Sequence, residues 1–297
     1  MDLSLDSDQE ALVTATADWC RANMPLEHVR DRPVDLWRDL EAMGWTAMTA
    51  PGLDLSHATE AMVFAELGRF LAPVALLSSA VAARWLGSAD KVALALDDGN
   101  RLRVFDGESA TLAIGVTSTQ ASVYRLPEGL SGAPGLDLSV SLTLLETAPA
   151  AEPLGNPHAA LHLQLLAAAF TVGCAEAARD MAAGYAIMRE QFERPIGWFQ
   201  ALKHMIADTA VRAAVARSQL CYAACALDAN APDAAFHIAA ARRLADQAAI
   251  DNSRTNIQVH GGIGMTDEAF PHFCLKRAHL LSFIAPAEQG ALLGEAS

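Results

Sequence analysis

The chain has little charge and few aromatic side chains for its length. Of its 297 residues, 19% are charged and 6% aromatic, whereas 52% are hydrophobic. Basic residues are scarce, since 21 Lys and Arg against 35 Asp and Glu give a formal charge of −14. A surface that binds nucleic-acid phosphates needs clustered Lys and Arg, so we expect no nucleic-acid partner. Intrinsic disorder is excluded too, because it combines low hydrophobicity with high net charge.

Cysteine is also sparse, and no Cys-x-x-Cys pair occurs. An odd number of cysteines without such pairs is typical of a reduced, intracellular protein. Cys221 and Cys225 lie four residues apart, on one face of a helix, a spacing that favours packing over a metal half-site. We therefore expect no metal site and a cytoplasmic location. The five cysteines are Cys20, Cys174, Cys221, Cys225 and Cys274.

The sequence shows no targeting segment or membrane span. Residues 1–6 are acidic and lack the basic-then-apolar order of a signal peptide. Uncharged stretches such as residues 71–83 are shorter than the ~20 residues that cross a bilayer. We therefore expect a protein that neither enters nor crosses a membrane.

The spacing of apolar residues divides the chain into three parts: residues 1–88, 89–152 and 153–297. Apolar residues recur every three or four positions in the first and third parts, which predicts helices. In the middle part they alternate with polar residues, which predicts about five short strands around the turn signal at residues 97–100. The strands are expected near residues 92–96, 102–104, 111–116, 122–126 and 136–145.

Short connections between long amphipathic helices predict an antiparallel bundle in the third part. A glycine turn at residues 261–264 is expected to precede the last helix. The other helices are expected at about residues 8–19, 36–43, 56–70, 74–87, 157–191, 201–228 and 234–256.

Two segments at helix ends combine residue types that suit an anionic, aromatic ligand. The first, residues 185–200, contains an Arg-x-x-Phe sequence, and the second, residues 256–264, contains Gln-x-x-Gly-Gly. Arginine offers a planar fork to phosphate, and adjacent glycines let a backbone approach an anionic group closely. Taken singly, the glycine pair is no more than a tight turn and the arginine a solvated helix end.

Together these segments resemble those of the acyl-CoA dehydrogenase family, flavoenzymes that oxidise an acyl-CoA thioester to its α,β-enoyl product. The resemblance is strongest over residues 185–278, and it extends to residues 37–45 and 64–73. It implies a mainly α fold with a small β domain: an N-terminal helical domain, a reduced middle sheet and a C-terminal four-helix bundle. The motifs of this family grip the ADP half of an FAD held by the neighbouring subunit. The matching residues here are Arg189, Phe192, Gln200, Gln258, Gly261 and Gly262.

The sequence departs from the family where the flavin ring and the catalytic base belong. No segment between residues 89 and 152 resembles the family's Thr-Glu-Pro-x-x-Gly-Ser-Asp motif; residues 131–135 form a plain loop. Counting from the Lys-Arg-Ala segment at 276–278 puts Ala285 at the usual position of the Glu base. Counting back from the Arg-x-x-Phe motif puts Leu163 at the position that other members use. Neither residue is a carboxylate, so we expect no catalytic base in this chain.

The remaining polar residues near these motifs have ordinary interpretations. Glu288 lies three residues after the usual base position and is a weak candidate, with a solvated charge as the alternative. Asp267 and Glu268 fit a loop or a helix cap. His260, where the family often has His, and His204 are expected to be structural.

The resemblance implies that this is the degenerate subunit of a heterotetrameric α2β2 dehydrogenase, whose full-length partner supplies the base and most of the acyl pocket. It further implies a shared FAD, an acyl-CoA substrate such as a steroid side-chain CoA thioester, and an electron-transfer flavoprotein. Two alternatives stay open: an active homo-oligomer with a displaced base such as Glu288, and a structural relative that binds no flavin. A subunit that depends on a partner should expose an apolar face.

Overall fold

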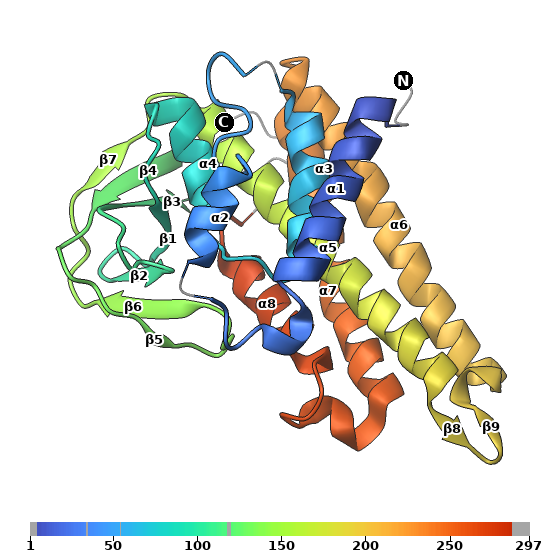
Figure 1. The fold of residues 1–297 in the computed structure, drawn as a ribbon. Helices are drawn as coiled ribbons and strands as arrows, with labels where there is room; N and C mark the ends of the chain where they lie inside the picture. Colours follow the sequence, from blue (N-terminus) through green and yellow to red (C-terminus); the bar gives the residue numbers. More distant parts are fainter. Residues whose placement is uncertain (1–4, 34, 54, 118–119, 287–297) are drawn as a thin grey trace.

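A computed structural model of the chain describes residues 5–33, 35–53, 55–117 and 120–286. A sheet lies on one side of the molecule and long helices on the other, with shorter N-terminal helices against both (Figure 1). In chain order the elements are helical, then β, then helical again. This is the expected fold class.

Four α-helices form the N-terminal part, and their positions agree with those predicted from the apolar spacing. Asp6 begins the first with a capping box that includes Gln9, and Ser56 caps the third. The elements are α1 (Ser7–Asn23), η1 (Leu26–His28), α2 (Leu36–Ala42), α3 (His57–Arg69) and α4 (Ala75–Leu86).

The sheet contains seven strands in the order β5-β6-β2-β1-β3-β4-β7. Strands β1 and β3 are parallel, and the other neighbours are antiparallel. Two more strands are present than expected, and both are very short. The strands are β1 (Val92–Asp97), β2 (Leu102–Phe105), β3 (Leu112–Thr117), β4 (Gln120–Arg125), β5 (Ala133–Pro134), β6 (Ser141–Leu145) and β7 (Ala151–Pro153).

The strand predicted over residues 136–145 is wrong in its first half, because β6 begins only at Ser141. The cause is Asp137, whose side chain is buried. One of its oxygens accepts from the backbone and the hydroxyl of Ser139, and the other accepts from Arg277 Nε at 2.6 Å. Such local side-chain bonds compete with the hydrogen bonds of a strand. Arg277 also donates to the carbonyl of Ala72, and so ties the N-terminal helices, the β6 loop and α8 together.

The C-terminal part is a bundle in which α5 packs against α3, α6, α7 and α8. A small hairpin follows α5, and a glycine-rich turn follows α7. The elements are α5 (His158–Met188), β8 (Glu190–Gln191), β9 (Arg194–Pro195), η2 (Ile196–Trp198), α6 (Gln200–Asp228), α7 (Ala234–His260), η3 (Gly261–Met265) and α8 (Pro271–Phe283).

Helix α5 corrects the expectation that every uncharged stretch is too short to span a membrane. Residues 153–175 include no Asp, Glu, Lys or Arg in 23 consecutive positions. By length and composition alone α5 could cross a bilayer, but 89% of its most apolar window is buried within the protein. Such burial is typical of the central helix of a bundle.

Helix α7 is longer than predicted. It was expected to end near Asn256, yet it continues for four more residues to His260, where Gly261 ends it with a φ of 68°. Gln258 and His260 therefore lie on the last helical turn rather than in the turn that follows.

Candidate functional site

A hollow of about 340 Å³ lies where α5 and α7 end, at the lower end of the bundle in Figure 1. The hairpin β8–β9 and the turn η3 complete its wall. Two residues of the predicted set, Arg189 and Gly262, line it. The complete lining is Tyr185, Arg189, Gln191, Ile196, Val259, His260, Gly262 and Ile263.

Arg189 caps the C-terminal end of α5, with its backbone N–H bonded to the carbonyl of Tyr185 at 2.8 Å. Its side chain is exposed and makes no ion pair or hydrogen bond within the described part of the chain. A guanidinium without an internal partner at the mouth of a hollow is available to an anionic ligand.

Tyr185 and His260 form a flat wall of the hollow. Their rings stack with centroids 4.0 Å apart and an angle of 22°. His260 Nδ1 donates to the carbonyl of Asn256 at 2.9 Å, so Nε2 is left as an acceptor. Burial lowers the pKa of His260, which keeps the ring neutral near pH 7. The interpretation of His260 as structural stays a prediction, but its ring borders the hollow.

The two adjacent glycines leave the backbone open at this end of α7. Gly261 adopts a positive φ, which favours glycine, and a Cβ placed on Gly262 would meet no atom within 4 Å. Gly264 differs, because a Cβ there would press on the carbonyl of Ile257. Gly262 can therefore let a ligand approach the backbone, whereas Gly264 permits close packing.

Four residues predicted to bind the cofactor are not part of the lining and are exposed. Phe192 is 82% exposed at the tip of the hairpin, Gln200 begins α6, Gln258 lies on α7, and Gly261 ends that helix. Sequence reasoning also missed five lining residues: Tyr185, Gln191, Ile196, Val259 and Ile263. Tyr185 lies one helical turn before Arg189, and this spacing is the signal that would have found it.

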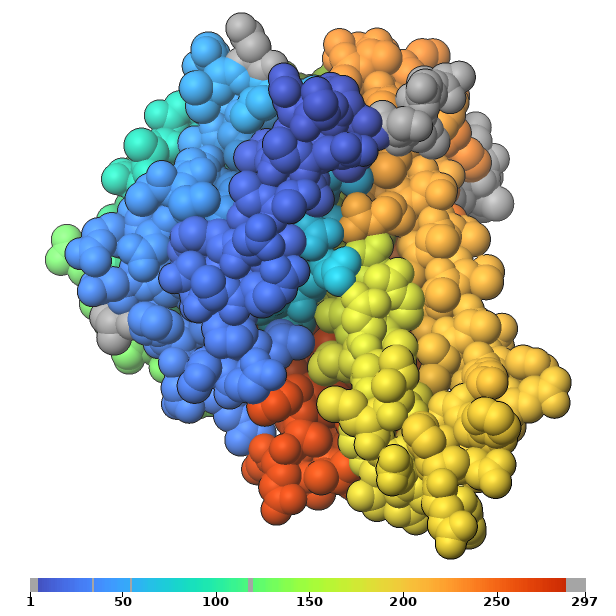
Figure 2. All heavy atoms as spheres, turned by 45° about the vertical axis from the view of Figure 1, so that its right-hand side comes forward, coloured from blue at the N-terminus to red at the C-terminus, as the bar shows by residue number. Residues whose placement is uncertain are grey.

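Phe192 belongs to a group of exposed apolar side chains that we call the hairpin patch: Ile187, Met188, Phe192 and Trp198. Their exposed fractions run from 63% to 82%. Figure 2 shows this segment, in yellow, projecting at the lower end of the molecule. Contiguous exposed apolar surface is typical of a protein–protein interface.

Neither base position of the family holds a titratable group. Ala285 is 2% exposed with a φ of 44°, and Leu163 is fully buried. Glu288 lies outside the described residues. Asp267 lies in the loop before α8 and pairs with Arg30 on the surface, and Glu268 is exposed beside it.

A second hollow, of about 190 Å³, lies between the sheet and α8. Its wall is mostly apolar, with Phe105, Leu142, Leu280 and Phe283 among its members. Asp137 also borders it, but its carboxylate is already engaged by Arg277. This wall offers few donors or acceptors to a polar ring system.

Comparison with known proteins gives matches over nearly the whole chain. The N-terminal domain of acyl-CoA dehydrogenases matches residues 6–88, and their C-terminal domain matches residues 160–284. Acyl-CoA dehydrogenase IpdE2 of Mycobacterium tuberculosis is 34% identical over 271 residues, which cover 84% of this chain and 82% of the relative. IpdE2 of Mycolicibacterium smegmatis is 32% identical over 265 residues, covering 82% and 81%.

Solved structures share the fold. The ChsE4–ChsE5 complex of Mycobacterium tuberculosis matches with a TM-score of 0.77 and 24% identity over 100% of both chains. A variant of the Tcur3481–Tcur3483 steroid acyl-CoA dehydrogenase matches with a TM-score of 0.79 and 22% identity over 97% of this chain and 96% of that one. The chain therefore belongs to the acyl-CoA dehydrogenase family, whose members are FAD-dependent oxidoreductases.

Proposed function

We propose that this chain is the non-catalytic subunit of a flavin-dependent acyl-CoA dehydrogenase and completes the FAD site of a catalytic partner. The observation that carries the proposal is an asymmetry. A hollow suited to the ADP half of FAD is present at the ends of α5 and α7, whereas both base positions hold buried apolar residues. An enzyme that worked alone would need both a complete FAD site and a catalytic base.

The hollow fits an adenosine pyrophosphate in charge and shape. Arg189 supplies a cationic fork for the pyrophosphate, and Gly262 leaves room for a ligand beside the backbone. The stacked rings of Tyr185 and His260 offer a flat face. Phe192, Gln200 and Gln258 lie exposed at the same end of the bundle, where a group held mainly by another subunit can reach them.

The reaction also needs groups that this chain does not supply. A carboxylate must lie within hydrogen-bond reach of the proton α to the thioester, and bound FAD supplies the acceptor for the hydride. Buried Ala285 and Leu163 cannot remove that proton. The apolar hollow between the sheet and α8 is poorly suited to an isoalloxazine ring. The base, the ring pocket and most of the acyl pocket are therefore assigned to the partner.

The partner proposed is a full-length acyl-CoA dehydrogenase subunit in an α2β2 assembly. The similarity to the ChsE4–ChsE5 complex and to the Tcur3481–Tcur3483 steroid acyl-CoA dehydrogenase supports this choice. The same likeness favours a steroid side-chain CoA thioester as substrate. An electron-transfer flavoprotein as acceptor and a cytoplasmic location complete the proposal, with no role for nucleic acid or a membrane.

Co-expression with the catalytic subunit tests the proposal. We expect the complex to purify yellow and to reduce a dye when given an acyl-CoA, whereas the lone chain carries no FAD. The double variant Arg189→Ala, Gln258→Ala should give a colourless complex. Arg254→Ala is the matched control, since Arg254 is an exposed cation of α7 outside the hollow.

The outcomes separate the alternatives. A lone chain that purifies yellow and active would contradict the proposal and favour the homo-oligomer with a displaced base. Glu288→Gln tests that alternative directly, because it should then abolish the rate. A complex that keeps its full FAD content in the double variant would favour the structural relative that binds no flavin.

A further inference from the structure

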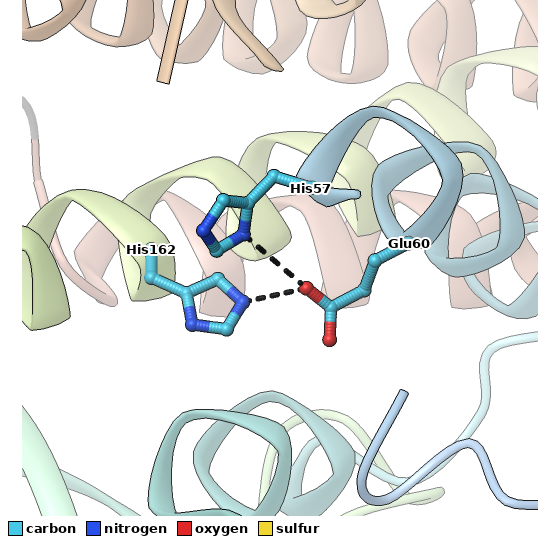
Figure 3. Close-up of side chains that lie close together, drawn as sticks. All are labelled: His57, Glu60 and His162. Carbon is cyan, nitrogen blue, oxygen red and sulfur yellow. Dashed lines mark hydrogen bonds and ion pairs between the residues drawn. The ribbon is translucent and has the colours of Figure 1, made fainter. Parts of the chain in front are cut away.

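A buried cluster of three side chains lies away from the hollow, where α3 and α5 pack together. His57 and Glu60 come from α3 and His162 from α5, and their exposed fractions are 4%, 0% and 0%. Both imidazoles point at the same carboxylate oxygen (Figure 3). His162 Nε2 lies 2.7 Å from Glu60 Oε2, and His57 Nδ1 lies 3.6 Å from it. Neither the fold nor the proposed flavin role requires this convergence.

Glu60 is a buried carboxylate whose ion-pair partners in the described part of the chain are imidazoles. Burial opposes its ionisation, whereas the N–H of His162 Nε2, which donates to Oε2, favours the carboxylate. Within the described residues, its ion-pair partners are these two histidines, and no Lys or Arg pairs with it. A buried carboxylate needs a compensating positive charge. Here that charge must be a proton on an imidazole or a metal ion.

The hydrogen bonds around His162 indicate that its ring is neutral. Trp85 Nε1 donates to His162 Nδ1 at 3.2 Å, and an indole N–H can only donate. Nδ1 therefore carries no proton, and Nε2–H donates to Glu60. The charge of Glu60 is thus not balanced by His162.

A ring nitrogen of His57 faces the same carboxylate oxygen of Glu60. Its Nδ1 is buried and has no hydrogen-bond partner, since 3.6 Å is too long for one. A buried nitrogen without a partner is unfavourable. A buried carboxylate and an unpartnered imidazole nitrogen therefore face each other.

We propose that His57 Nδ1, His162 Nε2 and Glu60 Oε2 form a binding site for a divalent transition-metal ion of the Zn²⁺ class. Two imidazoles and a carboxylate are a common zinc donor set. The three ligand atoms lie within 4.8 Å of one another. Bonds of about 2.0–2.1 Å to a tetrahedral ion place ligand atoms about 3.3 Å apart, so small side-chain movements would suffice. Thr49 Oγ1, 3.2 Å from both oxygens of Glu60, orients the carboxylate.

Binding costs two hydrogen bonds. When Nε2 of His162 becomes a ligand, its proton moves to Nδ1, so the indole N–H of Trp85 loses its acceptor and the bond from Nε2 to Glu60 is lost. Two net hydrogen bonds are small beside the binding free energy of a structural zinc ion. The ion would join α3 to α5 and place a positive charge beside Glu60. Sequence analysis predicts no metal site on the evidence of the cysteines. It does not reveal this cluster, because His162 is 102 residues from Glu60 and no spacing connects them.

Cobalt spectroscopy tests the site directly, because tetrahedral Co²⁺ absorbs visible light strongly. The chain, in complex with its partner, is stripped with a chelator and titrated with CoCl₂ and then ZnSO₄. We expect one cobalt per chain with a tetrahedral spectrum that zinc abolishes. His57→Ala, Glu60→Gln and His162→Gln should each weaken binding about 100-fold or more, since even losing an outer-shell partner costs about 10–100-fold.

The control is His158→Ala, because His158 lies one turn before His162 on α5 and its ring is also near Trp85. This variant should bind cobalt as the wild type does. Wild-type protein that gives no saturable tetrahedral spectrum overturns the proposal, whether or not the variants fold. Equal binding by wild type and His57→Ala also overturns it, since the metal is then adventitious. Neither outcome bears on the FAD content, so the flavin proposal is tested separately.

Discussion

At the scale of single residues, Glu60 and His162 predict how stability changes with pH in metal-free protein. Both have a folded pKa below the unfolded value of about 4.3 for Glu and 6.5 for His. The unfolded chain then binds more protons, so stability falls as the pH falls. The loss begins below about pH 6.5 through His162 and continues from about pH 4.3 towards pH 2 through Glu60.

Urea unfolding in the presence of a chelator, at a series of pH values from 7 to 3, checks this expectation. Glu60→Gln should be less stable at pH 7 and should show a shallower loss below about pH 4.3. Thr49→Val is a control that removes one hydrogen bond to Glu60 but no charge, so its acid slope should resemble that of the wild type. Parallel curves for wild type and Glu60→Gln would contradict the assignment.

Sequence reasoning reached part of the candidate site at this scale. The resemblance named Arg189 and Gly262, which the fold brings together at the hollow. The resemblance could not say which way Gln200 and Gln258 face, because the side chains of successive residues in an α-helix point about 100° apart. Since α7 extends to His260, Gln258 faces the surface. The roles of these residues stay predictions.

At the scale of elements, the packing of α3 on α5 depends on two glycines. A Cβ on Gly173 would overlap the backbone carbonyl of Ala65, and one on Gly68 would overlap Phe170. Gly173→Ala should therefore force the helices apart and destabilise the chain by about 1–3 kcal/mol, in spite of the better helix propensity of alanine. Because His57 and Glu60 lie on one helix and His162 on the other, the change should also weaken metal binding.

Gly184→Ala is the matched control, since it lies on the same helix and a Cβ there meets no atom within 4 Å. It should leave stability unchanged or raise it by up to about 1 kcal/mol. Thermal unfolding of both variants makes the comparison. Equal midpoints for the two alanine variants would show that the close approach of α3 and α5 does not limit stability.

The helices were predictable because their apolar period continues over several turns, and each expected helix is present within a few residues. The strands of the sheet were less predictable from the sequence. Strands β5 and β7 contain two and three residues, too few to show alternation. Residues 136–140 do alternate, but the bond between Asp137 and Arg277 joins positions 140 residues apart, which no local pattern reveals.

At the scale of the whole molecule, the order of helical, β and helical parts followed from the change of apolar period alone. The boundaries at residues 88 and 152 stay predictions. What the pattern could not locate is the surface that meets another subunit, because exposed and buried apolar residues look alike in a sequence. We propose the hairpin patch as that surface, since its side chains are exposed and it lies beside the hollow that contains Arg189.

The hairpin patch leads to a prediction about assembly. If a partner subunit covers it, Phe192→Ser with Trp198→Ser should remove most of the apolar contact, because aromatic side chains dominate such interfaces. We expect the variant to be more soluble alone and to lose the partner on size-exclusion chromatography after co-expression.

Leu136→Ser is the control, since Leu136 is 74% exposed on the side of the sheet, away from the hairpin. FAD should leave with the partner, because the hollow alone holds only half of the site. A double variant that still co-elutes with a yellow partner would place the interface elsewhere.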